Sequence, residues 1–132
     1  MKHDEPGLQK EPHTVLVVDD EQVIRNLTRN ILIREGFEVI LAESGLQACK
    51  TFEQKRAQID LVLLDMIMPD MDGKETYKRL RTILPDVRVV FSTGYSMNDP
   101  RLHVSSDEKT GFVQKPYSID ILISEIKRVL SL

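Results

Sequence analysis

Five polar side chains lie at the ends of short apolar segments of this 132-residue chain. They are three carboxylates, one hydroxyl and one ammonium: Asp19, Asp20, Asp65, Thr93 and Lys115. Carboxylate oxygens without nearby Cys or His ligands favour Mg²⁺, which also bridges to phosphate. A carboxylate beside such an ion can attack phosphorus and form an aspartyl phosphate. These residue types therefore predict phosphoryl chemistry, provided that the fold brings them together.

The apolar segments have the length and composition of buried β-strands. Three are rich in valine and leucine and two are weaker; in chain order they are residues 14–18, 38–41, 60–64, 87–91 and 112–114. Runs that are apolar on both faces are typical of strands in a parallel sheet covered by helices. The sequence therefore predicts five parallel strands.

Helical segments separate these strands and carry recognisable start and stop signals. In chain order the signals are Asp20 as a cap, Gly36 as a stop, the capping box Ser44 with Gln47, Gly73, the stop Pro85, and the cap Ser118. Helical spacing predicts that the first helix buries Val23, Ile24, Leu27, Ile31 and Leu32. By the same spacing the last helix buries Ile119, Leu122, Ile126, Val129 and Leu130.

Alternating strands and helices predict a doubly wound α/β sheet, because parallel neighbours need a crossover connection. We interpret residues 1–13 as a flexible arm and 14–132 as one domain. Ligands of such sheets bind outside the carboxyl ends of the strands, where the polar residues named above are placed. Each of them alone could be a helix cap or a solvated charge, but their joint placement favours one site.

Charge and composition exclude several classes of function. The formal net charge is −3 and no basic stripe with aromatics is present, which argues against nucleic acid as a ligand of this domain. No apolar run approaches the roughly 20 residues that span a bilayer. We therefore expect a cytoplasmic domain without membrane contact, in which the lone Cys49 is a small core residue.

Four motifs of the chain resemble those of the receiver domain of bacterial response regulators. They are VLVVDDE, LVLLDMIMPDMDG around Asp65, FSTG around Thr93, and Lys115-Pro116, and the resemblance covers residues 14–131. It implies a flavodoxin-like fold with strand order 2-1-3-4-5. It also implies that Asp65 takes a phosphoryl group from a histidine kinase or a histidine phosphotransfer protein, and that a partner-binding surface switches in response.

The same resemblance implies roles for individual residues. Mg²⁺ is expected to be bound by Asp20, Asp65 and the backbone carbonyl of Ile67, with Asp19 acting largely through water. Lys115 and Thr93 then contact phosphoryl oxygens, and the Lys115–Pro116 peptide is expected to be cis. Phe112 is expected to turn inward as Thr93 moves, although an ordinary core aromatic would fit that position equally well.

Two other functions stay open at this point. A phosphohydrolase with an aspartyl nucleophile usually needs a second acid two residues further on, where this chain has Ile67. A scaffold that no longer accepts phosphate is also possible, although every required side chain is present. Neither a Walker lysine motif nor a GxGxxG turn follows a strand, which excludes common nucleotide sites. The sequence fits both a stand-alone regulator and a receiver from a hybrid kinase or a larger regulator.

Two further expectations concern the region around Thr93. A helix over 98–108 has poor helix formers and is expected to be short or mobile, with His103 at the surface. Ile67 and Tyr95 are expected to flank the phosphoryl group. Neither is suited to orient an attacking water, so we expect slow self-dephosphorylation.

Overall fold

The computed structural model describes residues 12–94 and 107–132. Five parallel strands form one sheet in the order β2-β1-β3-β4-β5, which confirms the predicted fold and strand order. The strands are β1 (Thr14–Val18), β2 (Glu38–Ala42), β3 (Leu61–Asp65), β4 (Val89–Thr93) and β5 (Thr110–Gln114). The helices are α1 (Gln22–Arg34), α2 (Gly45–Lys55), α3 (Gly73–Ile83) and α4 (Ile119–Leu130).

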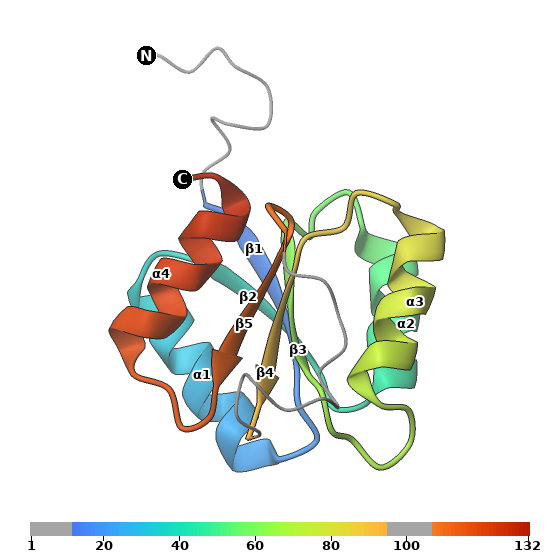
Figure 1. The fold of residues 1–132 in the computed structure, drawn as a ribbon, viewed down its shortest axis with the longest axis horizontal. Coiled ribbons are helices and arrows are strands. Elements are labelled where there is room, and N and C mark those ends of the chain that lie inside the picture. The colour runs from blue at the N-terminus through green and yellow to red at the C-terminus, as the bar shows by residue number, and fades with distance from the viewer. Residues whose placement is uncertain (1–11, 95–106) are drawn as a thin grey trace.

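Side chains of the central strands alternate between two cores because successive residues of a strand point to opposite faces. In β1, Leu16 and Val18 belong to one core, whereas Val15 and Val17 belong to the other. Helices α2 and α3 cover the first face, and α1 and α4 cover the second, as Figure 1 shows. Burial on both faces explains why these strands are apolar without interruption.

The strand boundaries differ slightly from those expected. β3 begins at Leu61 and ends at Asp65, one residue later than expected at both ends. β4 begins two residues later than predicted and ends with Thr93. As a result, the predicted site residues Asp65 and Thr93 are the last residues of β3 and β4.

The predicted helix signals at Ser44, Ser118 and Gly36 are confirmed. The Ser44 hydroxyl accepts from the Gln47 amide at 3.1 Å, and the Ser118 hydroxyl accepts from the Ile121 amide at 3.1 Å. The side-chain oxygen of Gln47 accepts a hydrogen bond from the amide of Glu43, one residue before the cap. Gly36 ends α1 with a φ of 93°, a left-handed conformation that favours glycine. At α3 the cap is Asp72, and Gly73 is the first helical residue.

Helix α1 departs most from the sequence-based expectation. Asp20 was expected to cap it, but the N-cap is Glu21, and its amide is bound by the Asp19 carboxylate at 2.9 Å. Val23 and Leu27 were expected in the core, but they are 78% and 55% exposed. The polar Thr28 is buried in their place. Ile119 at the start of α4 is likewise exposed. A wide apolar stripe does not fix which part of it contacts the sheet, and helix rotation against the sheet decides this.

Several expectations concern residues outside the described ranges. The predicted helix over 98–108, apart from its last two residues, lies there, as do His103 and Tyr95. Residues 1–11 of the predicted arm also lie outside, whereas His13 is buried and its carbonyl accepts from the Glu38 amide. Within 12–94 and 107–132, no helix is long and apolar enough to cross a membrane.

Candidate functional site

The carboxyl ends of β1 and β3 bring three carboxylates together. Asp19 and Asp20 follow β1 directly, and Asp65 is the last residue of β3. The chain order of the sheet reverses between these two strands, since β2 lies on one side of β1 and β3 on the other. One carboxylate oxygen from each residue lies within 4.8 Å of the others. Asp19 and Asp65 are buried, whereas Asp20 is exposed.

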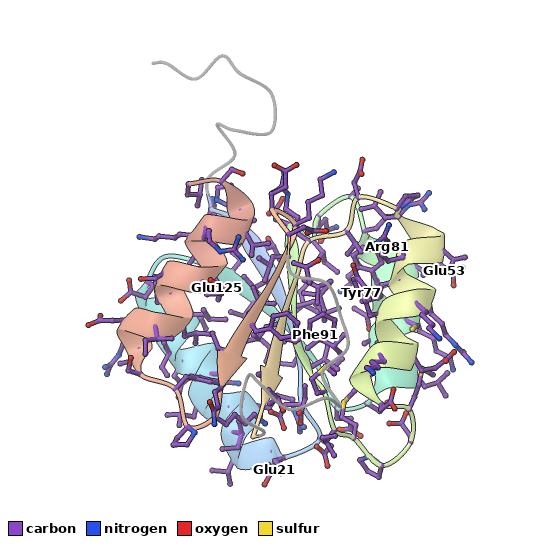
Figure 2. All side chains as sticks on the ribbon, viewed as in Figure 1. Glu21, Glu53, Tyr77, Arg81, Phe91 and Glu125 are labelled. Carbon is purple, nitrogen blue, oxygen red and sulfur yellow. The ribbon has the colours of Figure 1, made fainter. Side chains whose placement is uncertain are left out.

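Backbone amides hold the two buried carboxylates in place. Asp19 Oδ1 accepts from the Glu21 amide at 2.9 Å, and Asp65 Oδ1 accepts from the Ile67 amide at 3.2 Å. In both cases the donor is two residues beyond the acid, which is the geometry of an Asx turn. Glu21 marks this end of the molecule in Figure 2, where the arrows of the strands point. The second oxygen of each carboxylate is thereby directed toward Lys115.

The Lys115 ammonium lies between the two buried acids. Its Nζ is 2.9 Å from Asp19 Oδ2 and 3.4 Å from Asp65 Oδ2. Its backbone amide donates to the Thr93 carbonyl at 2.7 Å, which ties the residue after β5 to the end of β4. The peptide between Lys115 and Pro116 is cis, as the family resemblance implied.

The electrostatics of the site follow from burial and from these contacts. Burial raises the pKa of Asp65 to about 6; the Lys115 charge opposes this effect and the Asp19 charge adds to it. For Lys115, burial lowers the pKa, but the hydrogen bond to Asp19 and the two carboxylate charges outweigh it and leave the pKa raised. Near neutral pH the three acids and the ammonium carry a net formal charge close to −2. A divalent cation would balance that charge.

The donor set fits a hard divalent cation. All three carboxylates offer oxygen, and no His or Cys belongs to the cluster. Mg²⁺ is usually bound by a small number of carboxylates and keeps several of its water ligands. Because Asp20 is exposed, solvent can supply those waters. Ile67, two residues beyond Asp65, is 52% exposed. The residues present therefore fit the cation that the sequence predicts.

Thr93 and Phe112 lie on the adjacent strands β4 and β5. Thr93 is fully buried as the last residue of β4. Phe112 is half-buried and stacks on Phe91, with ring centroids 5.4 Å apart and planes at 25°. Tyr77 meets the same Phe91 ring edge-on at 5.2 Å, and Figure 2 shows Tyr77 and Phe91 on the α3 side of the sheet. Phe112 is thus part of an aromatic cluster that borders β4.

Sequence reasoning missed two contacts of the site. Arg25 on α1 donates to the backbone carbonyl of Asp19 at 2.7 Å and approaches Glu43 at 3.9 Å. Thr28 on α1 bonds the hydroxyl of Tyr117, two residues beyond Lys115. A basic and a polar residue among the apolar positions of the first helix were the available signals, and they are weak ones.

Comparison with known proteins agrees with this geometry. The family model of the response regulator receiver domain matches residues 15–127. Sporulation initiation phosphotransferase F of Bacillus subtilis is 36% identical over 121 residues, which cover 89% of this chain and 94% of that protein. Sensor kinase CckA of Brucella abortus is 34% identical over 89% of this chain, but the match spans only 12% of the kinase.

Solved structures show the same fold. The response regulator protein TrrA from Thermotoga maritima, in complex with Mg(2+)-BeF, has a TM-score of 0.77 at 33% identity, with 89% of this chain and 98% of that chain covered. A response regulator receiver domain protein from Clostridium thermocellum has a TM-score of 0.82 at 27% identity, with 90% and 94% covered. The fold and the acidic site define a phosphoacceptor class of α/β domain. The chain belongs to the response regulator receiver domain family of two-component systems.

Proposed function

We propose that Asp65 is the residue that accepts the phosphoryl group. The observation that carries this proposal is the placement of the Lys115 ammonium between Asp19 and Asp65, beside the cluster of three carboxylates. Of the two carboxylates that contact Lys115, Asp65 is the one at the end of the central strand β3, next to the solvent-exposed Ile67. Its carboxylate is ionised above a pKa of about 6, and hence is nucleophilic at neutral pH.

The surrounding residues receive roles that follow from their chemistry. Asp19, Asp20, Asp65 and the carbonyl of Ile67 would hold Mg²⁺, with Asp19 acting largely through water. The cation would supply charge neutralisation for the phosphoryl oxygens and the attacking carboxylate. Lys115 would pair with a further phosphoryl oxygen, and the Thr93 hydroxyl would donate to another. The location of these groups at one edge of the sheet supports this division.

The reaction is a transfer between two side chains. An Asp65 oxygen attacks phosphorus of a phosphohistidine on the donor, a P–O bond forms and the P–N bond breaks. The electron pair of the P–N bond stays on the imidazole nitrogen, which can then take a proton. The donor is a histidine kinase or a histidine phosphotransfer protein, consistent with relatives named as sensor kinases and as a response regulator.

Thr93 and Phe112 form the proposed switch. An added phosphoryl group attracts the Thr93 hydroxyl, which opens space for Phe112 at the neighbouring strand. Phe112 is half-buried against Phe91, so a further inward rotation changes the surface that β5 presents. The alternative, an ordinary core aromatic, predicts the same exposure of Phe112 before and after phosphorylation.

Phosphohydrolase activity is the second candidate. It usually needs an acid two residues beyond the nucleophile, and this position holds the apolar, exposed Ile67. Turnover of a small phosphate ester separates the two functions, since a receiver reacts nearly once per molecule and does not turn over rapidly.

Intact-mass measurement tests the acceptor. Acetyl phosphate with Mg²⁺ is expected to add one phosphoryl group to the protein, and Asp65→Asn is expected to abolish the addition. Asp86→Asn is the matched control, because Asp86 is an exposed acid that pairs with Lys109 at 2.8 Å near the amino end of β4. Stoichiometric labelling of Asp65→Asn, or loss of labelling in the control, would overturn the assignment.

A further inference from the structure

Thr28 and Tyr117 join the middle of α1 to the loop that carries Lys115. Their hydroxyl oxygens are 2.9 Å apart, although the residues are separated by 89 positions in the sequence. Thr28 is 2% exposed, and the half-buried Tyr117 packs against the core between the sheet and helices α1 and α4. The hydrogen bond is partly buried, so breaking it costs more than it would at a fully exposed position.

This hydrogen bond attaches the loop to α1 two residues beyond Lys115. On the amino-terminal side, Lys115 is fixed by its amide bond to the Thr93 carbonyl. On the carboxyl-terminal side, Pro116 has no N–H group to donate. Tyr117 comes next, directly before Ser118, which caps α4. Pro116 cannot hold the loop by a backbone N–H hydrogen bond, and the next residue, Tyr117, holds it through the hydrogen bond of its hydroxyl to Thr28.

A cavity lies beside this anchor. It has a volume of about 350 Å³ and is lined by residues of α1 and of the loop: Ile24, Leu27, Thr28, Lys115, Pro116 and Tyr117. The loop consequently has space into which it can move if the anchor is lost. Lys115 itself belongs to this lining, so a movement of the loop into the cavity would move the backbone that carries the ammonium.

We propose that the hydrogen bond between Thr28 and Tyr117 positions the Lys115 ammonium for the phosphoryl oxygens. Tyr117 is a positioning residue here, since it acts through Lys115 and does not touch the phosphoryl group. The inference rests on the proposed function, in which Lys115 pairs with the phosphoryl group. The effect falls on phosphoryl binding, because Tyr117 acts through Lys115 and no hydrogen bond described for Thr28 or Tyr117 reaches a carboxylate of the site.

The affinity for beryllofluoride, a phosphoryl analogue, separates these two effects. In the presence of Mg²⁺, Tyr117→Phe and Thr28→Val are each expected to weaken beryllofluoride binding about three- to tenfold, the range set by one modest hydrogen bond. Mg²⁺ affinity measured alone is expected not to fall, because displacing the Lys115 ammonium from Asp19 and Asp65 removes a positive charge that opposes cation binding. Calorimetry gives both affinities, and it suits a chain that has no tryptophan. Thr28→Ser keeps a hydroxyl and is expected to restore analogue binding.

Tyr77→Phe is the matched control. It also removes a tyrosine hydroxyl, 3.4 Å from the hydroxyl of the buried Thr110, on the opposite face of the sheet. We expect its analogue affinity to equal that of the parent. If Tyr117 had a purely structural role, Tyr117→Phe and Thr28→Val would lower thermal stability and leave analogue binding intact. That result would overturn the inference. Equal weakening of Mg²⁺ and analogue binding would overturn it too, because the whole site would then be distorted.

The Lys115→Met background distinguishes failure of this inference from failure of the proposed function. Lys115→Met is expected to weaken analogue binding, and Tyr117→Phe is expected to add nothing further in that background. If Lys115→Met leaves analogue binding intact, the proposed role of Lys115 fails, and the inference fails with it. If Lys115→Met weakens binding but Tyr117→Phe has a full additional effect, only the inference is overturned.

Discussion

Lys115, directly after β5, reaches Asp19, directly after β1, across the ends of the two strands that separate them. The Nζ–Oδ2 distance is 2.9 Å, and β3 and β4 lie between β1 and β5 in the sheet. The same ammonium contacts Asp65 on the intervening β3 at 3.4 Å. One cation thus partly offsets the repulsion of two buried carboxylates, and the remaining negative charge is available to a metal ion.

The stability of the metal-free protein is expected to fall as pH rises through about 6. The pKa of Asp65 is raised to about 6 from 3.8, so the folded state holds a proton between these values that the unfolded state has released. The stabilisation is therefore present near pH 4 and lost above pH 6. At pH 7.5, Asp65→Asn is expected to be more stable than the parent by about 1 to 3 kcal/mol, because each pKa unit corresponds to about 1.4 kcal/mol.

Urea unfolding from about pH 4 to about pH 8, a range that extends past the raised pKa of about 6, checks this expectation. Saturating Mg²⁺ is expected to remove the decline of the parent's unfolding free energy with pH. It is expected to have little effect on the unfolding free energy of Asp65→Asn. Parallel pH profiles of the two proteins without metal would contradict it.

Gly73→Ala is expected to damage both stability and the acidic site. A Cβ at Gly73 would lie 2.7 Å from the Asp65 carbonyl oxygen and 2.7 Å from Met66 Cα, and such backbone atoms cannot move away easily. The Gly73 amide also donates to the Met66 carbonyl at 2.8 Å. We expect a loss of about 2 to 3 kcal/mol in urea unfolding, in the range of other overpacking substitutions.

Gly94→Ala serves as the control for Gly73→Ala. A Cβ at Gly94 meets nothing within 4 Å, so its unfolding free energy is expected to match that of the parent. If Gly73→Ala costs no more than Gly94→Ala, the close approach of α3 to the end of β3 is not a constraint.

Glu125 is expected to stabilise the outer edge of β5. Its carboxylate accepts from the Phe112 amide at 2.9 Å and from Arg128 at 3.0 Å, and β5 is the last strand of the sheet. Glu125→Ala leaves that edge amide without its partner and is expected to lower the unfolding free energy by about 1 to 2 kcal/mol. Glu75→Ala, which breaks an exposed pair with Arg79, is expected to cost about 0.5 kcal/mol or less.

Gly111 provides an independent check of the same contact. Its added Cβ would lie 2.2 Å from Glu125 Oε2, so Gly111→Ala and Glu125→Ala disturb one interaction. In a double-mutant cycle the two losses are expected to be less than additive. Full additivity would show that the carboxylate does not hold the edge of β5.

The phosphorylated protein is expected to lose its phosphoryl group slowly. Ile67 is 52% exposed beside Asp65 and has no polar group that could orient a water for in-line attack. A variant with Ile67→Asn and Tyr95→Glu supplies such groups at both expected flanks and is predicted to decay several-fold faster. Mass spectrometry in excess Mg²⁺ follows both decays. Equal rates, or faster decay of the parent, would refute the prediction.

Much of this protein follows from the sequence alone. The three inner strands β1, β3 and β4 are mostly apolar because both faces of the sheet are buried there, and that pattern needs no tertiary information. The caps Ser44 and Ser118 are local, since each hydroxyl binds an amide three residues away. The position of Asp19, Asp20 and Asp65 at strand ends follows from the same pattern, because parallel strands end at one edge.

Tertiary structure decided which side of α1 faces the sheet. Val23 and Leu27 belong to its apolar stripe, yet they are exposed, and the polar Thr28 is buried. Thr28 can be buried because the hydroxyl of Tyr117, 89 positions later in the chain, accepts or donates its hydrogen bond. Likewise, the pairing of Lys115 with Asp19 and the pKa of Asp65 depend on burial and on distances between strands. Local sequence encodes secondary structure and the chemistry of each residue, whereas contacts between distant segments exist only once the sheet has formed.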